Sequence, residues 1–327
     1  MLQYLQSLSD HDRLYIRALD ITSHRDFDST SNNIVYTDIA DAACVHNVLL
    51  IQSLLGTRIS DLALTDTGWA PESLIDIVQM SLMTTNHLQQ FQMSLFKVES
   101  FLLSDLMDSL TRLYRRDQGS LKSLVLDLAQ PLPADQWQAI AGCTELQDFH
   151  LGLYRSSEPI LTDILVRILP QWSSLSSLYL CQPRALTAGT VRSLYKDLPR
   201  PEGLHELHLI FEACQANLYE DEFLKMIRAM PNLWTLEAHL DWTDQMMHQV
   251  ATTLKDLRRL SITCSSAEFT CCGIREVAWG QGLEKINMRT SGKIWRGFLD
   301  AIRRRSRRVR ILVYGSMKWG GSVDEWE

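Results

Sequence analysis

A six-residue phrase with apolar residues at its first, fourth and sixth positions recurs eleven times along this chain of 327 residues. Nine of the ten intervals between successive starts are 24–33 residues long, and the first interval is 43. Between many copies lies an amphipathic helical pattern, as in residues 160–169. The repeat therefore predicts one short strand and one helix per unit. Since a single unit cannot bury its own apolar face, the units must stack.

The eleven copies of the phrase are Ile16-Leu19-Ile21, Ile59-Leu62-Leu64, Leu88-Phe91-Met93, Leu121-Leu124-Leu126, Leu146-Phe149-Leu151, Leu175-Leu178-Leu180, Leu204-Leu207-Leu209, Leu233-Leu236-Ala238, Leu257-Leu260-Ile262, Leu283-Ile286-Met288 and Val309-Leu312-Tyr314. Their apolar positions are expected to point into the core, and the alternate residues to point outward. Pro159 and Pro133 precede helical patterns, and Thr187 and Thr243 are predicted N-caps.

These registered phrases resemble those of the leucine-rich-repeat family, over residues 14–315. The resemblance implies an α/β leucine-rich-repeat solenoid (horseshoe), with a parallel sheet on the concave face and helices on the convex face. We expect one domain over residues 1–327, with a C-terminal cap at residues 315–327. Residues 22–36 make the first interval too long, and this polar stretch is predicted to be a surface loop or a partner-binding loop.

Two further resemblances suggest functions. The segments Tyr15–Ile21 and Trp319–Glu327 look like those of fungal F-box/leucine-rich-repeat proteins, which implies a substrate-recognition subunit of an SCF-type ubiquitin ligase. The repeat spacing is similar to ribonuclease-inhibitor-like proteins, which implies an alternative role of binding and regulating an enzyme, as GTPase-regulating relatives do. Residues 1–13 are too few to form an F-box. An SCF adaptor is therefore an expected partner only if an F-box is encoded upstream, in which case the chain is a fragment.

Composition restricts the environment and the chemistry. Hydrophobic residues make up 46% of the chain, which excludes a wholly disordered protein. Seven scattered cysteines without CxxC spacing indicate free thiols in a reducing compartment, cytoplasmic or nuclear. No apolar run is long enough to span a membrane. No phosphate-binding, nucleotide-binding or hydrolase motif is present, so we expect no enzyme activity, no cofactor and no metal.

Charge is distributed unevenly. The formal net charge is −7, yet residues 255–310 hold fourteen Lys and Arg against five Asp and Glu, a net +9. The run Arg303–Arg308 is expected to complement a helix dipole, or to serve as a nuclear address or an acidic-partner patch. The acidic body and the lack of interleaved aromatic residues argue against nucleic-acid binding.

The outward positions of the strand phrases are the candidate binding residues. Neighbouring strands lie about 4.8 Å apart, so Glu206, His208, Glu237 and His239 should form one patch beside Tyr179. Three interpretations remain open for this patch: a solvated face, a protein-binding surface, and a metal or acid–base site. A basic patch is expected next to it. The complete set of candidate partner-binding residues is Asp148, His150, Tyr179, Glu206, His208, Glu237, His239, Arg259, Lys285 and Arg289.

Overall fold

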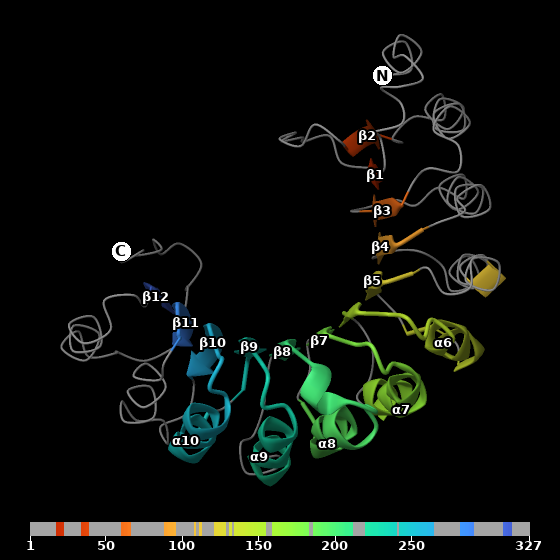
Figure 1. Cartoon of the computed structure of the whole chain (residues 1–327). Coiled ribbons are helices and arrows are strands. Elements are labelled where there is room, and N and C mark those ends of the chain that lie inside the picture. Colours follow the sequence, from red (N-terminus) through yellow and green to blue (C-terminus); the bar gives the residue numbers. More distant parts are fainter. Residues whose placement is uncertain are drawn as a thin grey trace. The chain divides into compact units, whose positions relative to one another are not determined.

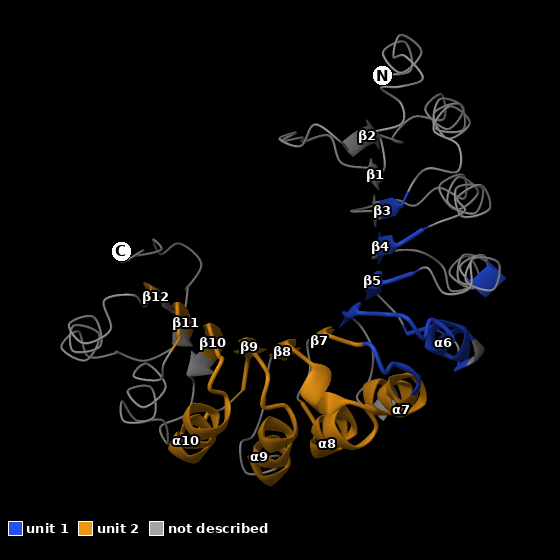
Figure 2. Ribbon diagram, viewed as in Figure 1, with its two compact units in different colours: residues 1–156, 171–174 blue, residues 157–170, 175–327 orange. Residues whose placement is uncertain are grey.

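In a computed structural model of the chain, the described residues are 18–22, 34–38, 60–66, 88–95, 108, 111–112, 121–128, 131–132, 134–154, 159–182, 186–211, 220–240, 242–264, 282–290 and 310–315. They belong to two compact units (Figure 2). Unit 1 comprises Met1–Ser156 with Gln171–Ser174, and unit 2 comprises Ser157–Pro170 with Leu175–Glu327. That residues 1–327 behave as one domain stays a prediction.

Unit 1 is built on parallel strands. They are β1 (Ala18–Thr22), β2 (Ile34–Asp38), β3 (Asp61–Asp66), β4 (Gln90–Leu95), β5 (Ser123–Leu128) and β6 (Asp148–Leu153). Their spatial order is β2-β1-β3-β4-β5-β6, and every pair is parallel. Helix α6 (Ala134–Ala141) connects β5 to β6 and lies to one side of the strands (Figure 1).

Unit 2 repeats the same strand-and-helix unit more regularly. Its strands are β7 (Ser177–Gln182), β8 (Glu206–Phe211), β9 (Thr235–Ala238), β10 (Arg259–Cys264), β11 (Lys285–Thr290) and β12 (Arg310–Gly315), parallel and in chain order. Its described helices are α7 (Pro159–Ile168), α8 (Ala188–Lys196), α9 (Glu220–Ala229) and α10 (Asp244–Thr253). Figure 1 shows these helices side by side on one face of the strands.

The core forms where the sequence pattern predicts it. Strands β5, β7 and β8 alternate between partly exposed and buried side chains. In unit 2, Leu178, Leu207 and Leu236 occupy equivalent register positions and are all completely buried. The helices add their apolar faces, such as Val191 and Leu194 of α8. This continuous layer buries the apolar face that each unit would expose alone, and it confirms the expected α/β solenoid architecture.

Local signals at the ends of helices are also confirmed. The Thr187 side chain accepts a hydrogen bond from Thr190 N at 3.1 Å, and Thr243 accepts one from Met246 N at 3.2 Å. Each cap satisfies an N–H that has no partner inside its helix. Trp242 is fully buried behind α10, and its Nε1 donates to the Ala238 carbonyl at 2.9 Å. Buried tryptophans need such a partner for their N–H group.

The expected loop near the N-terminal end is wrong in its bounds. Residues 34–36 belong to β2, which pairs in parallel with β1, so the expected loop of residues 22–36 extends too far; residues 23–33 lie outside the described residues. The run Ile34-Val35-Tyr36 has high strand propensity, which explains the outcome. The cap predicted at residues 315–327 stays a prediction, because all of it except Gly315, the last residue of β12, lies outside the described residues.

The last copy of the phrase is displaced by one residue. Ile311 pairs in register with Ile286, and Val313 pairs with Met288. The side chains of Ile286 and Met288 are buried. The register therefore aligns positions 311 and 313 of β12 with the buried positions of β11, whereas the sequence pattern aligned Leu312 and Tyr314 with them. Because side chains alternate between faces, this one-residue shift moves Arg310 to an outward position.

Replacement of Leu178 by Ala tests the register of the core. Because Leu178 is completely buried, its truncation should lower the free energy of unfolding by about 2–5 kcal/mol. The measurement is urea denaturation followed by circular dichroism. Ser177→Ala, at the neighbouring outward position, is the matched control and should change stability by no more than about 0.5 kcal/mol. Equal effects of the two substitutions would show that the register is wrong.

Candidate functional site

Two rows of outward side chains cross the strands of unit 2. Tyr179, His208, Glu237, Ser261 and Asn287 occupy one register position on successive strands. A second row, two residues earlier in each strand, contains Glu206, Thr235, Arg259, Lys285 and Arg310. Residues two apart share a face of a strand, so both rows lie on the side opposite the buried leucines. The parallel register thus positions the candidate site.

The acid–histidine cluster consists of Glu206, His208, Glu237 and His239. His208 Nδ1 lies 2.8 Å from Glu237 Oε2, and His208 Nε2 lies 4.0 Å from Glu206 Oε2. His239 Nε2 lies 3.4 Å from Glu237 Oε1. The Tyr179 ring lies beside that of His208, with centroids 5.4 Å apart. These distances confirm that the predicted patch forms, with Tyr179 next to it.

Glu237 is the centre of this cluster. Besides the two histidines, Ser261 Oγ donates to Glu237 Oε1 at 3.2 Å. The hydrogen bond from His208, followed by that from His239, holds the pKa of Glu237 well below its ordinary value of 4.5, against the opposing effect of burial. The carboxylate is therefore ionised at neutral pH, and its oxygens are occupied by side chains of neighbouring strands.

Trp234 is a surface residue next to the acid–histidine cluster. It is 41% exposed, immediately before β9, and its Nε1 donates to Glu206 Oε1 at 3.1 Å. Its ring stacks on His205 at 4.9 Å, and the Arg258 guanidinium lies 5.9 Å from the ring centroid. His205, Trp234 and Arg258 each come one residue before a strand, and together they form an aromatic and cationic surface, the Trp234 ledge. Because the three positions are equivalent in the repeat, an alignment of the repeats could have identified this surface from the sequence.

A hollow of about 530 Å³ lies beside the acid–histidine cluster. The described residues around it include Glu206, His208 and Glu237 on one side. Arg259, Lys285 and Arg310 also line it, together with Glu284. The predicted basic patch is thus confirmed for Arg259 and Lys285. The side chain of Arg289 lies outside the described residues, and Arg310 was missed because of the one-residue shift in the last phrase.

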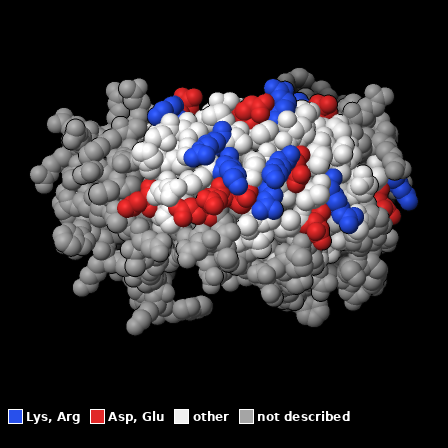
Figure 3. Space-filling view, turned by 90° about the horizontal axis from the view of Figure 1, so that it is seen from below, with Lys and Arg blue, Asp and Glu red and all other residues white. Residues whose placement is uncertain are grey.

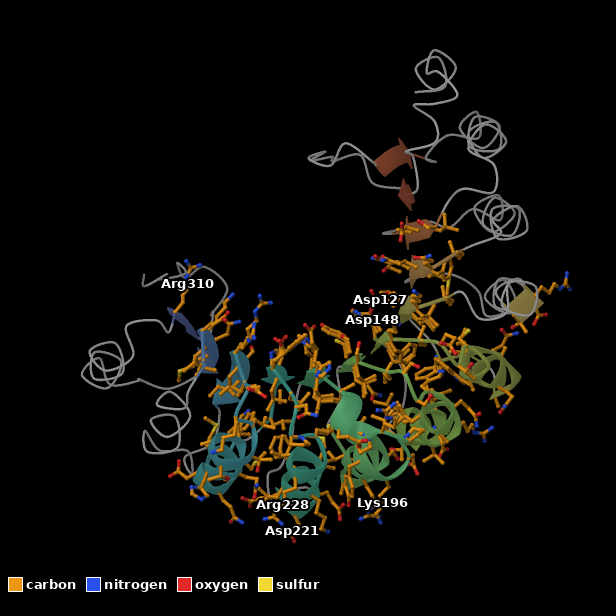
Figure 4. The ribbon with its side chains drawn as sticks, in the orientation of Figure 1. Asp127, Asp148, Lys196, Asp221, Arg228 and Arg310 are labelled. Carbon is orange, nitrogen blue, oxygen red and sulfur yellow. The ribbon has the colours of Figure 1, made fainter. Side chains whose placement is uncertain are left out.

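Asp148 and His150 lie in unit 1, on β6. His150 Nε2 is 3.1 Å from Asp127 Oδ1, and Asp127 Oδ2 accepts a hydrogen bond from Ser94 Oγ at 2.9 Å. Burial would raise the pKa of Asp127, but its interactions with His150, Ser94 and Tyr154 lower it below the ordinary value of 3.8. Figure 4 shows Asp127 and Asp148 on the adjacent strands β5 and β6.

Gly152 provides the space for this second network. It is the register partner of Asp127 on β6, and a Cβ atom there would overlap Asp127 Oδ1. The sequence analysis missed Asp127. The repeat pattern does not reveal that the glycine opposite it on the next strand leaves room for its carboxylate. The network belongs to the surface of unit 1, whereas the acid–histidine cluster belongs to unit 2.

Two free cysteines, Cys143 and Cys181, lie in the described part of the chain. Within it, no group of three or more His, Cys, Asp or Glu residues is arranged to hold a metal ion. Cys143 is a buried free thiol, and burial raises its pKa to about 12, so it remains protonated. No helix among the described residues is long and apolar enough to cross a membrane.

The helix side of the molecule has a different character. In Figure 3, seen from below, Lys and Arg side chains are interspersed with those of Asp and Glu. Contacts between the helices include Glu222 of α9, which accepts a hydrogen bond from Tyr195 of α8 and lies 3.3 Å from Arg192 Nη2. Such exposed mixed charges contribute little individually to stability. The helix side provides a useful reference surface for charge substitutions.

Comparisons with known proteins find matches among solved structures, at low sequence identity. No protein-family model matches the sequence, and no curated protein matches it. Among solved structures, a chain from the crystal structure of the Rad7 and Elc1 complex in yeast is 14% identical, with a TM-score of 0.48; the match covers 86% of this chain and 83% of that one.

Two other similar structures are described as leucine-rich-repeat proteins. One, from Leptospira interrogans, is 13% identical with a TM-score of 0.41, covering 86% of this chain and 71% of that one. The leucine-rich repeat domain of APL1B is 13% identical with a TM-score of 0.25, covering 81% and 84%. The α/β solenoid architecture rests on the chain's own repeated strands, their parallel register and their buried leucines.

Glu237→Gln tests the electrostatics of the cluster. The ionised form of Glu237 stabilises the folded state above the ordinary carboxyl pKa of 4.5, and this contribution is lost as the pH falls below that value. At pH 7 the variant should therefore be less stable, by on the order of 1–2 kcal/mol. The difference from the wild type should shrink steadily below pH 4.5 in urea denaturation experiments.

Asp221→Asn is the control for this experiment. Asp221 is an exposed carboxylate on α9 with no described partner. Its replacement should leave the pH dependence of stability unchanged. A difference between wild type and Glu237→Gln that stays constant from pH 7 to pH 3 would contradict the assigned role of Glu237.

Proposed function

We propose that this chain is a non-enzymatic protein–protein interaction scaffold, and that the outward strand face of unit 2 binds a protein target. The observation that carries the proposal is the acid–histidine cluster with its two aromatic neighbours, Tyr179 and Trp234. Both aromatic side chains are accessible, and each contacts a polar member of the cluster. Tyrosine, tryptophan and arginine are the side chains most enriched at binding hot spots.

The cluster is already organised before a partner arrives. Glu206 is held by Trp234, and Glu237 by His208, His239 and Ser261. Side chains fixed in this way lose less conformational entropy on binding than freely rotating ones. Regular parallel strands hold these side chains in a fixed order, and the fold does not restrict which outward residues they carry. Preorganised side chains on such a face support recognition of a macromolecular surface.

The finer proposal is a substrate-recognition role in an SCF-type ubiquitin ligase, in the cytoplasm or the nucleus. Its support is the sequence resemblance of residues 15–21 and 319–327 to F-box/leucine-rich-repeat proteins. One of the similar solved structures is itself a two-protein complex, that of Rad7 and Elc1. In this proposal, the strand face carries the target, and an adaptor contact is made elsewhere in the protein.

Glu206→Lys tests the proposed target-binding face. The chain is purified by affinity from its native organism, and bound proteins are quantified by mass spectrometry. Glu206 borders the hollow and is 38% exposed, so reversal of its charge should reduce recovery of a stoichiometric target at least about tenfold. Asp221→Lys on α9 makes the same change in charge on the helix side and should retain the target. Full recovery with both variants, each with an unaltered melting temperature, would place the binding surface elsewhere.

The same purification distinguishes the finer roles. Recovery of an SCF adaptor and a cullin with the wild-type protein is expected for the ligase role. That recovery should be unaffected by Glu206→Lys, because the adaptor contact is separate from the target contact. Recovery of one enzyme in equal amount, with no adaptor or cullin, would overturn the ligase proposal and support the enzyme-regulator alternative.

A further inference from the structure

Three cations form a row at one register position of β10, β11 and β12. Arg259 pairs in register with Lys285, and Lys285 pairs with Arg310. The backbone N–H of Arg310 also donates to the Glu284 carbonyl at 2.8 Å, which fixes the start of β12. Neighbouring strands are about 4.8 Å apart, so this cationic row extends for roughly 10 Å. All three residues line the same hollow.

The two sides of the hollow differ in how their charges are satisfied. On the acidic side, Glu206 and Glu237 accept hydrogen bonds from side chains of the protein itself. Among the described residues, no side-chain hydrogen bond or ion pair engages Arg259, Lys285 or Arg310. Glu284 also lines the hollow, and no described ion pair joins it to these cations. The hollow therefore presents cationic donors that the described fold leaves without acceptors.

Holding three like charges in adjacent register positions is unfavourable. Like charges directly opposite each other on neighbouring strands destabilise a sheet. A bound anion removes this repulsion and gains charge-assisted hydrogen bonds from the guanidinium and ammonium groups. A concave surface also concentrates the field of the charges that line it. These effects favour an anionic ligand at the cationic row.

We propose that the cationic row binds an acidic segment of the protein partner, with neighbouring Asp or Glu side chains. This inference rests on the proposed function and specifies the chemistry of the partner. Carboxylates spaced along an extended peptide are close enough to engage two or three members of a row about 10 Å long. The Trp234 ledge, which joins the acidic side through Glu206, is available for an apolar side chain of the same segment.

The carboxylates around the hollow favour a short acidic peptide over a nucleic acid. Glu206, Glu237 and Glu284 lie beside the cations, and they would repel the continuous phosphate backbone of a polynucleotide. A short peptide can place its carboxylates on the cations and extend to the acidic side only through an apolar side chain at Trp234. The net charge of −7 adds to the repulsion of a long polyanion.

The test measures fluorescence anisotropy of a fluorescein-labelled hexaglutamate peptide titrated with the full chain at about 50 mM salt. The peptide should bind, and its affinity should fall as the salt concentration rises, because exposed charges are screened. Arg259→Glu combined with Lys285→Glu should weaken binding at least about tenfold. Arg310→Gln, which removes one charge without reversing it, should weaken binding more mildly and is not expected to perturb the fold.

The matched control reverses two charges on the helix side of the same unit. Lys196→Glu combined with Arg228→Glu produces the same change in net charge, and Figure 4 shows both residues on the helices, away from Arg310 on β12. This control should bind the peptide like the wild type. Equal weakening by the control pair would show a general charge effect and overturn the inference.

Two further probes separate the possible occupants. The probes are a labelled peptide with phosphoserine in place of glutamate and a labelled single-stranded oligonucleotide. Binding of either probe without binding of the hexaglutamate peptide would overturn the proposal of an acidic peptide segment as the ligand. If hexaglutamate fails to bind while target recovery still depends on Glu206, the inference fails and the proposed function stands. If hexaglutamate binding requires Arg259 and Lys285, the assignment of the cationic row is supported whatever the identity of the target.

Discussion

The structure depends on the burial of apolar side chains that no single repeat can bury alone. Leu178, Leu207 and Leu236 lie at the same register position of adjacent strands and are completely excluded from solvent. Each strand therefore presents one face to the core and needs the next strand to cover its edge. A shift of one residue would exchange the buried leucines for polar side chains, so the core fixes the register of every outward residue.

This fixed register explains why charged side chains meet in defined partnerships on the outer face. Glu237 is surrounded by His208, His239 and Ser261, which come from three strands. The strand frame brings His208 and Ser261 to Glu237 from the two adjacent strands, 29 and 24 residues away in the sequence, whereas His239 is only two residues from Glu237. The cluster is thus a consequence of hydrophobic stacking on the opposite face. Its polar groups then lower the pKa of Glu237 and fix the side chains that a partner would meet.

The outer face of unit 2 is electrostatically asymmetric. Its acidic side is satisfied by internal hydrogen bonds, whereas the row of Arg259, Lys285 and Arg310 has no described acidic partner. The sequence shows a concentration of basic residues between positions 255 and 310, of which the contiguous run Arg303–Arg308 is the most evident part. In the structure, Arg259, Lys285 and Arg310 are separated in sequence but adjacent on the sheet.

The sequence by itself determined the repeat architecture, most core positions and the membership of the acid–histidine cluster. The alternation of inward and outward side chains is a local property of each strand, and eleven copies of the phrase repeat the same alternation. Only the tertiary structure decided features that depend on a neighbouring strand. The outward position of Arg310 follows from the pairing of β12 with β11, since one weak phrase could be aligned in two ways. The exposure of Trp234 and the site of Asp127 opposite Gly152 likewise depend on adjacent repeats. Contacts across strands join residues more than twenty positions apart, and a local pattern holds no information about which of them will meet.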